Sequence, residues 1–282
     1  MRSEQDMTDI DEDALAEAYK KGLELEKSGD LDGAEAEYRK ALALDPSDPG
    51  GVSIRLAAMG REAAPERMPE AYVATLFDQH ADVFDDILVD QLGYCVPILL
   101  REKVRELGLG PFDRLLDLGC GTGLTGISFS DCTNHMTGVD LSEQIVEVAY
   151  DREVYEDLYV GEAVSFLEEF EEEDGSTPLW DFIAATDVFP YLGAIEPMVT
   201  AAAARLEPRG FFAFSTETLP EDVLSGRDYM VGRKQRFAQS ESYLRRVLGA
   251  EGFAILSLDP ITVRLEDGEP VPGHMIIARK LS

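Results

Sequence analysis

The sequence predicts an α/β fold with a largely parallel sheet that carries helices on its faces. From residue 111 onward, short apolar runs alternate with stretches of helical length, a pattern that requires parallel strands joined by helical crossovers. The last two apolar runs are joined without room for a helix, which adds an antiparallel strand near the end. Before residue 111, apolar residues recur at helical spacing instead.

Seven short apolar runs are the expected strands of this sheet. Helix-length segments separate most of the first six, and the seventh follows the sixth closely. We therefore expect residues 111–282 to form one domain with a seven-stranded sheet whose last strand is antiparallel. The runs are 114–118, 136–139, 157–160, 181–185, 210–215, 254–258 and 274–278.

Four segments are expected before this domain. Residues 1–13 form an acidic tail that we expect to be disordered. Residues 14–48 predict a helical hairpin, because the helical pattern breaks at 28–30, where Gly29 can end one helix and Asp30 can cap the next. Residues 49–69, rich in Pro and Gly, form a connector with at most one short helix, and residues 70–110 form a helical segment with two helices around a loop.

Small and aromatic residues recur along the hairpin at positions where two helices would cross closely. These positions are Ala18, Gly22, Leu25, Ala34, Tyr38 and Ala41. The pattern resembles a single tetratricopeptide repeat, in which the aromatic side chain fills the gap between small residues. One repeat cannot bury its own apolar face, so the hairpin is expected to lean on another part of the chain or to bind a protein partner. An ordinary amphipathic hairpin packed on the main domain is the alternative.

Composition narrows the class of protein. The 282 residues include 56 acidic and 25 basic side chains, a formal charge of −31 that would repel a phosphate backbone, so no nucleic-acid substrate is expected. No run approaches the ~18 apolar residues of a membrane span, and the acidic N-terminus is unlike a signal peptide. Three unpaired Cys favour a reducing, cytoplasmic location, and three scattered His with them give no metal-binding spacing.

The clearest functional signal is a Gly-rich turn after the first strand. The sequence LLDLGCGTG at 115–123 places three glycines where the backbone must bend sharply and where a ligand must approach it closely. Residues 121–126 also spell G-x-G-x-x-G, the dinucleotide fingerprint, and Asp140 lies 19 residues after Gly121, near the spacing of a ribose-binding acid. Spacing alone leaves two cofactor classes open.

Charge separates these classes. A dinucleotide would place its pyrophosphate on this turn, whereas Asp117 at the end of the strand is expected to point a carboxylate toward the same site. S-adenosylmethionine has no phosphate, and its sulfonium and ammonium groups would be favoured by that carboxylate. The expected cofactor is therefore S-adenosylmethionine, with a dinucleotide and an incidental Gly-rich turn as the alternatives.

With this turn the chain resembles the class I S-adenosylmethionine-dependent methyltransferases, which have a Rossmann-like sheet. With its hairpin it is similar to bacterial proteins, predicted to be methyltransferases, that carry such a repeat. The resemblance is loose over 15–282 and tight over 117–123. It implies that the turn wraps the methionine part, that the end of the second strand holds the ribose, and that the loop after the third strand lies beside the adenine. In this chain these positions are Asp117, Gly119, Cys120, Gly121, Thr122 and Gly123, then Asp140 and Leu141, then Glu162 and Ala163.

The same resemblance implies residues around the transferred methyl group. Thr186 and Asp187 end the fourth strand, where the family places residues that flank the methyl; a helix N-cap is the alternative role for Asp187. Residues 77–85 are similar to a Y-D-x-x-A-x-x-Y-D segment that covers the cofactor in many small-molecule methyltransferases, with Phe77 and Phe84 in place of the tyrosines. A plain amphipathic helix is the alternative there. A general base is needed only if the acceptor keeps its proton, and His80 and Asp187 are the candidates.

The predicted function is methyl transfer from S-adenosylmethionine to a small-molecule acceptor. Four cations lie within residues 227–236 of this acidic chain, which is compatible with an anionic acceptor because Arg matches carboxylates; a solvated loop paired to nearby acids is the alternative. Two other functions remain open at this stage. One is an interaction protein that binds the cofactor without turnover, and the other is an NAD-dependent oxidoreductase.

Overall fold

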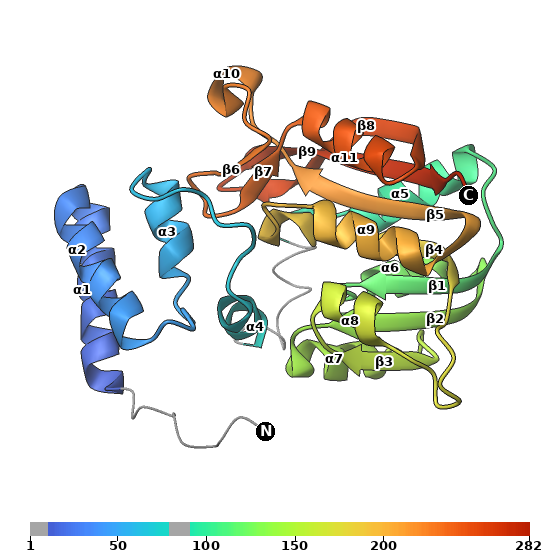
Figure 1. The fold of residues 1–282 in the computed structure, drawn as a ribbon, viewed down its shortest axis with the longest axis horizontal. Helices are drawn as coiled ribbons and strands as arrows, with labels where there is room; N and C mark the ends of the chain where they lie inside the picture. Colours follow the sequence, from blue (N-terminus) through green and yellow to red (C-terminus); the bar gives the residue numbers. More distant parts are fainter. Residues whose placement is uncertain (1–10, 79–90) are drawn as a thin grey trace.

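The computed structural model describes residues 11–78 and 91–282, and in this part of the chain its sheet has nine strands. The central strand is β1 (Phe112–Leu118). On one side lie β2 (Thr133–Asp140) and then β3 (Asp157–Val160), and on the other lie β4 (Trp180–Ala185) and β5 (Leu206–Glu217). These five strands are parallel, so their carboxyl ends share one edge of the sheet (Figure 1).

The other side of the sheet is antiparallel. β9 (Glu269–Lys280) pairs with both β5 and β8 (Phe253–Glu266). The turn between β8 and β9 is Asp267-Gly268, both at positive φ, as a tight hairpin turn requires. All seven predicted strands are present, and the antiparallel last strand is confirmed.

Two short strands were not predicted. β6 (Tyr229–Val231) and β7 (Phe237–Gln239) form a small hairpin, and β7 joins the sheet through one pairing with Glu217 at the end of β5. Each has only three residues, which is too short to produce a recognisable apolar run.

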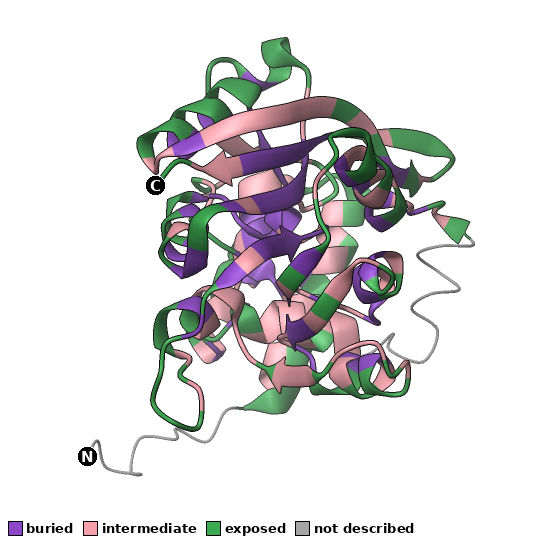
Figure 2. Cartoon of the chain, turned by 90° about the vertical axis from the view of Figure 1, so that its right-hand side faces the viewer, coloured by how far each residue is buried: buried purple, intermediate pink, exposed green. Residues whose placement is uncertain are grey.

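Helices cover both faces of the sheet, and the central strands β1, β2, β4 and β5 are largely buried between them (Figure 2). Buried residues of α8, α9 and α11 pack on one face, and those of α5 and α6 pack on the other. The fold is therefore a three-layer α/β sandwich. The helices of this unit are α5 (Val96–Glu106), α6 (Leu124–Phe129), α7 (Glu143–Tyr150), α8 (Ala163–Glu169), α9 (Glu196–Arg205), α10 (Glu221–Leu224) and α11 (Glu241–Ala250).

The expected helical hairpin is present at the N-terminal side. It consists of α1 (Glu12–Ser28) and α2 (Leu31–Leu44), with Gly29 in the left-handed conformation between them. α1 begins two residues before the expected start at residue 14, because the Asp11 side chain accepts a hydrogen bond from the Ala14 N–H and caps the helix. The helices cross closely, since a Cβ at Gly22 would lie 2.5 Å from the Tyr38 ring.

A short helix covers the apolar face of the hairpin. α3 (Val52–Ala58) lies within the 49–69 connector, and its Val52 and Leu56 join the hairpin residues in one cluster. Ile54 of the same helix packs into a second cluster with Tyr191 and Phe237 of the sheet unit. The hairpin thus packs against α3, and α3 lies between the hairpin and the sheet unit (Figure 1).

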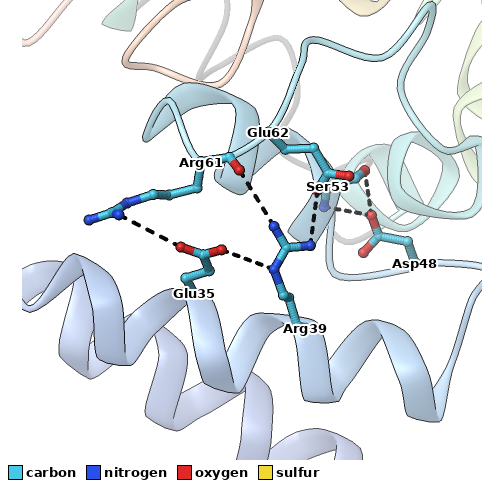
Figure 3. A network of polar contacts seen from close by, with 6 residues as sticks. All are labelled: Glu35, Arg39, Asp48, Ser53, Arg61 and Glu62. Carbon is cyan, nitrogen blue, oxygen red and sulfur yellow. Dashed lines mark hydrogen bonds and ion pairs between the residues drawn. The ribbon is translucent and has the colours of Figure 1, made fainter.

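Polar contacts fix α3 to the hairpin (Figure 3). Beyond the end of α3, Glu62 lies 3.9 Å from Arg39 of α2. At the start of α3, the Asp48 carboxylate accepts hydrogen bonds from the Val52 N–H and from the N–H and hydroxyl of Ser53. Both ends of α3 are therefore held.

The segment that was expected to cover the cofactor is described only in part. α4 (Glu70–Asp78) and α5 lie within residues 70–110, whereas His80 and Phe84 fall outside the described residues. Within the described ranges, no helix combines the length and the apolar character needed to cross a membrane.

Candidate active site

A cleft opens at the carboxyl ends of β1, β2 and β4, the edge where parallel α/β sheets bind ligands. Its volume is about 1000 Å³ including the part open to solvent. Most of the predicted binding residues line it. They are Phe77, Gly119, Cys120, Gly121, Thr122, Asp140, Leu141, Glu162, Ala163, Thr186 and Asp187.

The Gly-rich turn forms the floor of the cleft. Gly119, Gly121 and Gly123 all have positive φ, of 63°, 54° and 94°. A Cβ at Gly119 would lie 2.5 Å from Cγ2 of Val188, whereas nothing lies within 4 Å of a Cβ position at Gly121. The turn thus requires glycine and leaves open space above Gly121. Gly123 begins α6 and does not line the cleft.

Asp140 lies at the end of β2 and is held by two backbone groups. Its Oδ2 accepts from the Gly121 N–H at 2.9 Å, and its Oδ1 accepts from the Ser142 N–H at 3.0 Å. Burial raises the pKa of this carboxyl, and the two backbone hydrogen bonds oppose the shift. Leu141 adds a third backbone hydrogen bond, and because a carboxylate has about four acceptor sites, Asp140 can still accept from a hydroxyl donor such as that of a ribose.

Asp117 does not line the cleft. It is fully buried, and its Oδ2 accepts a hydrogen bond from the Tyr155 hydroxyl at 2.6 Å. Strand side chains alternate between the two faces of a sheet, and Asp117 shares the face of Leu115, which packs with α5 and α6. Its carboxylate therefore faces the interior beneath the turn, not the cleft as expected. Burial raises its pKa to about 7.

Glu162 caps a helix at the edge of the cleft. It is the N-cap residue of α8, and its Oε2 accepts from the N–H and the hydroxyl of Ser165. The same oxygen lies 3.9 Å from Arg67, which is 3.2 Å from Glu70. Glu162 and Ala163 line the cleft as predicted, with the Glu162 carboxylate already holding the start of a helix.

Asp187 lines the cleft from a left-handed backbone conformation, with φ of 60°. Its N–H donates to the Ser215 hydroxyl at 2.8 Å, and its Oδ1 lies 3.5 Å from Nη1 of Arg264. Arg264 is only 2% exposed and donates to Glu217 at 2.6 Å. The alternative role as a helix N-cap is not observed, since Val188 precedes the 3₁₀ helix η3 (Phe189–Tyr191).

The same Glu217 also contacts Arg236, which lies behind the cleft residue Tyr191. Nε of Arg236 lies 3.8 Å from Glu217, and Nη1 of Arg236 donates to the Tyr191 hydroxyl at 2.5 Å. Burial alone would lower the pKa of Arg236, but Tyr191, Asp187 and Glu217 raise it above its ordinary value. Asp187 is therefore paired with the buried Arg264 and Tyr191 with the partly buried Arg236, and both arginines contact the Glu217 carboxylate.

The four cations of residues 227–236 do not give the cleft a positive charge. Arg236 is balanced by Glu217, and Lys234 pairs with Asp267. Among the described residues that line the cleft, Arg67 is the one Lys or Arg, and the acids are Glu70, Asp140, Glu162 and Asp187. This lining does not support the expected anionic acceptor.

Sequence reasoning missed most of the wall opposite the turn. Tyr94 precedes α5 and is 6% exposed; burial and then the Asp187 carboxylate raise its pKa well above the ordinary value. Tyr191 meets Phe77 edge-on at 5.5 Å between ring centroids, and its carbonyl accepts from the Met68 N–H. No local motif marks these residues, because the tertiary fold brings them to the cleft from separate segments.

Residues 94–258, more than half of the chain, match the family model described as a methyltransferase domain. The chain belongs to this methyltransferase domain family. By family and fold it is an S-adenosylmethionine-dependent methyltransferase, and the open space at Gly121 and the free lone pairs of Asp140 fit that cofactor.

Individual relatives match over short segments. An 18S rRNA (guanine-N(7))-methyltransferase of Arabidopsis thaliana is 42% identical over 67 residues, which are 22% of this chain and 23% of that protein. A ubiquinone biosynthesis O-methyltransferase of Hydrogenovibrio crunogenus is 26% identical over 106 residues, 36% of this chain and 42% of that protein. The chain thus spans less than half the length of these relatives.

Solved structures share the fold at low identity. An S-adenosylmethionine-dependent methyltransferase from Clostridium acetobutylicum aligns with a TM-score of 0.52 at 15% identity, covering 73% of this chain and all of that chain. The [4+2]-cyclase SpnF aligns with a TM-score of 0.51 at 18% identity, covering 65% of this chain and 80% of that chain.

The expectation that nucleic acid is excluded was wrong. Relatives from Arabidopsis thaliana, Bos taurus and Dictyostelium discoideum are named 18S rRNA methyltransferases. The expectation rested on a net charge of −31, which is summed over the whole surface and does not describe how one acceptor group reaches a cleft.

Proposed function

We propose that this chain transfers the methyl group of S-adenosylmethionine to a small-molecule acceptor held near Tyr94, Asp187 and Tyr191. The observation that carries the proposal is the position of Asp140, which is hydrogen-bonded to the Gly-rich turn at one end of a cleft whose other end is an aromatic wall. The cofactor, when bound, supplies a methyl carbon that a nucleophile can attack.

The residues of the chain serve mainly to position the cofactor and the acceptor and to exclude water from the cleft. Asp140 accepts the ribose hydroxyls, and the open backbone at Gly121 admits the methionine part. Val73, Phe77 and Leu192 give the cleft an apolar lining that keeps water from the reacting atoms. Correct placement of two reactants is worth on the order of 7–11 kcal/mol of the barrier, so no strong base is required for an acceptor that has already lost its proton.

Asp187 accepts a hydrogen bond from the acceptor group and takes its proton where one must be removed. Arg264 at 3.5 Å balances its charge, so the carboxylate remains a fixed acceptor of hydrogen bonds. With Arg67 already beside Glu70, the lining favours an acceptor that is neutral or cationic and largely apolar.

An RNA base is the second candidate acceptor. It is favoured by the relatives that are 18S rRNA methyltransferases, one of which is 42% identical over 67 residues. That stretch is 22% of this chain and is shorter than the family match at 94–258.

A transfer assay separates the candidates. The purified protein is incubated with methyl-tritiated S-adenosylmethionine and cell extract, which is then split into a small-molecule fraction and an RNA fraction with and without ribonuclease. We expect label in the small-molecule fraction, with the Asp140→Ala variant as the background control. Label that ribonuclease releases would instead identify an RNA acceptor. Tight cofactor binding with no labelled product in either fraction would contradict the enzymatic proposal.

A further inference from the structure

The last residue of α4 contacts the ribose-binding end of the cleft. Oδ1 of Asp78 accepts a hydrogen bond from the Ser142 hydroxyl at 2.5 Å. α4 contacts α7 and contributes Glu70, Val73 and Phe77 to the lining of the cleft, and Phe77, the residue before Asp78, meets the ring of Tyr191. α4 therefore touches both the cofactor side and the acceptor side of the cleft.

Ser142 links this contact to Asp140. Ser142 is fully buried and caps α7, accepting from the Ile145 N–H at 3.2 Å. Its own N–H donates to Oδ1 of Asp140 at 3.0 Å, and the other oxygen of Asp140 accepts from Gly121. A continuous hydrogen-bonded chain thus runs from Asp78 through Ser142 and Asp140 to the Gly-rich turn.

We infer that Asp78 is a positioning residue for the cofactor, which holds Ser142 and through it the orientation of Asp140. The inference rests on the proposed function, because it requires the ribose to bind at Asp140. Without Asp78, the Ser142 hydroxyl loses its acceptor and can turn toward Asp140, where it would occupy a lone pair that a ribose hydroxyl needs.

Removing Asp78 has two opposed effects. The hydrogen bond to Ser142 is lost, which weakens cofactor binding. A negative charge near Asp140 is also lost, which relieves a repulsion, because burial and then Asp78 raise the pKa of Asp140. A hydrogen bond to a charged acceptor is worth roughly tenfold to a hundredfold in an equilibrium. Because only part of the free energy of this hydrogen bond affects cofactor binding, we expect the affinity for the cofactor to fall about tenfold.

Two variants separate these effects. Asp78→Asn keeps an oxygen that accepts from Ser142 but removes the charge, whereas Asp78→Ala removes both. S-adenosylhomocysteine is the probe, since it lacks the sulfonium charge and its affinity reports the positioning more than the electrostatic attraction. Its dissociation constant is measured by calorimetry and its dissociation rate by stopped flow at pH 8.

We expect Asp78→Ala to bind S-adenosylhomocysteine about tenfold more weakly, mainly through faster dissociation, while Asp78→Asn stays within about threefold of the wild type. Ser142→Ala removes the same hydrogen bond to Asp78 together with the cap of α7, and it should also weaken binding. The matched control for Ser142→Ala is Ser240→Ala, which removes an equivalent N-cap from α11. Ser240 lies outside the cleft, so this variant should leave the affinity for S-adenosylhomocysteine unchanged.

The outcomes are distinguishable. Asp78→Ala with the affinity and dissociation rate of the wild type would overturn the inference, as would equal weakening by Asp78→Asn, because that variant keeps the oxygen that accepts from Ser142. A wild-type protein that does not bind S-adenosylhomocysteine would overturn the proposed function itself, and the inference with it. The melting temperature of each unliganded variant shows whether a loss of binding reflects unfolding.

Discussion

The buried Asp117 makes the stability of the fold depend on pH in a predictable direction. Burial raises its pKa to about 7, against about 3.9 for an unfolded Asp. A carboxyl that binds its proton more tightly in the folded state stabilises the fold below the unfolded pKa, and this stabilisation is lost as the pH rises toward the folded pKa. The difference between the two pKa values corresponds to about 4 kcal/mol over the whole range.

Asp117→Asn tests this reasoning, because the amide still accepts from Tyr155 but does not titrate. Asp140, whose charge also raises the pKa of Asp117, is coupled to this titration, whereas the acids that do not interact with Asp117 cancel in the comparison. From pH 5 to pH 8, we expect the free energy of unfolding of the variant to rise by roughly 2–3 kcal/mol relative to the wild type. Urea denaturation at each pH measures this difference. Curves of stability against pH that run parallel for the two proteins would refute the assignment.

Three further substitutions test the cleft. Asp140→Ala removes the acceptor of both ribose hydroxyls, so calorimetry should show S-adenosylhomocysteine binding weakened by ~100-fold or more; unchanged affinity would contradict the role of Asp140. Gly119→Ala places a Cβ 2.5 Å from Val188 at a residue with positive φ. It should lower the free energy of unfolding by about 1–3 kcal/mol more than the control Gly175→Ala, because Gly175 also has positive φ but has no atom within 4 Å of its Cβ position. Equal losses in urea denaturation would show that the contact with Val188 costs no stability. Tyr94→Phe should keep the affinity for S-adenosylhomocysteine and lower the rate of methyl transfer about tenfold, and an unchanged rate would exclude its hydroxyl from the acceptor site.

The sequence predicted the sheet well because buried parallel strands leave a strong local signal. Each of the strands β1 to β5 is a short apolar run, and the Asp267-Gly268 turn leaves no room for a helix between β8 and β9. The residues of the Gly-rich turn and Asp140 were also predictable, since their spacing follows from the strand, turn and helix that hold a ligand at this edge.

The direction of side chains and the distant contacts were not predictable in the same way. The position of Asp117 in the sequence did not reveal that it faces α5 and α6, because that depends on how the pleat of β1 is turned. Arg264 reaches Asp187 from β8, and Arg236 reaches Tyr191 from the loop before β7. These pairs join residues that are far apart in the chain, so no local sequence pattern predicts them.

The seven residues of α3 connect the N-terminal hairpin to the sheet unit, because they pack against both. Val52 and Leu56 belong to the hairpin, whereas Ile54 belongs to the cluster that contains Tyr191. Removing the residues before the sheet unit would therefore remove Ile54, a packing partner of Tyr191, and so would change the support of a ring that lines the cleft.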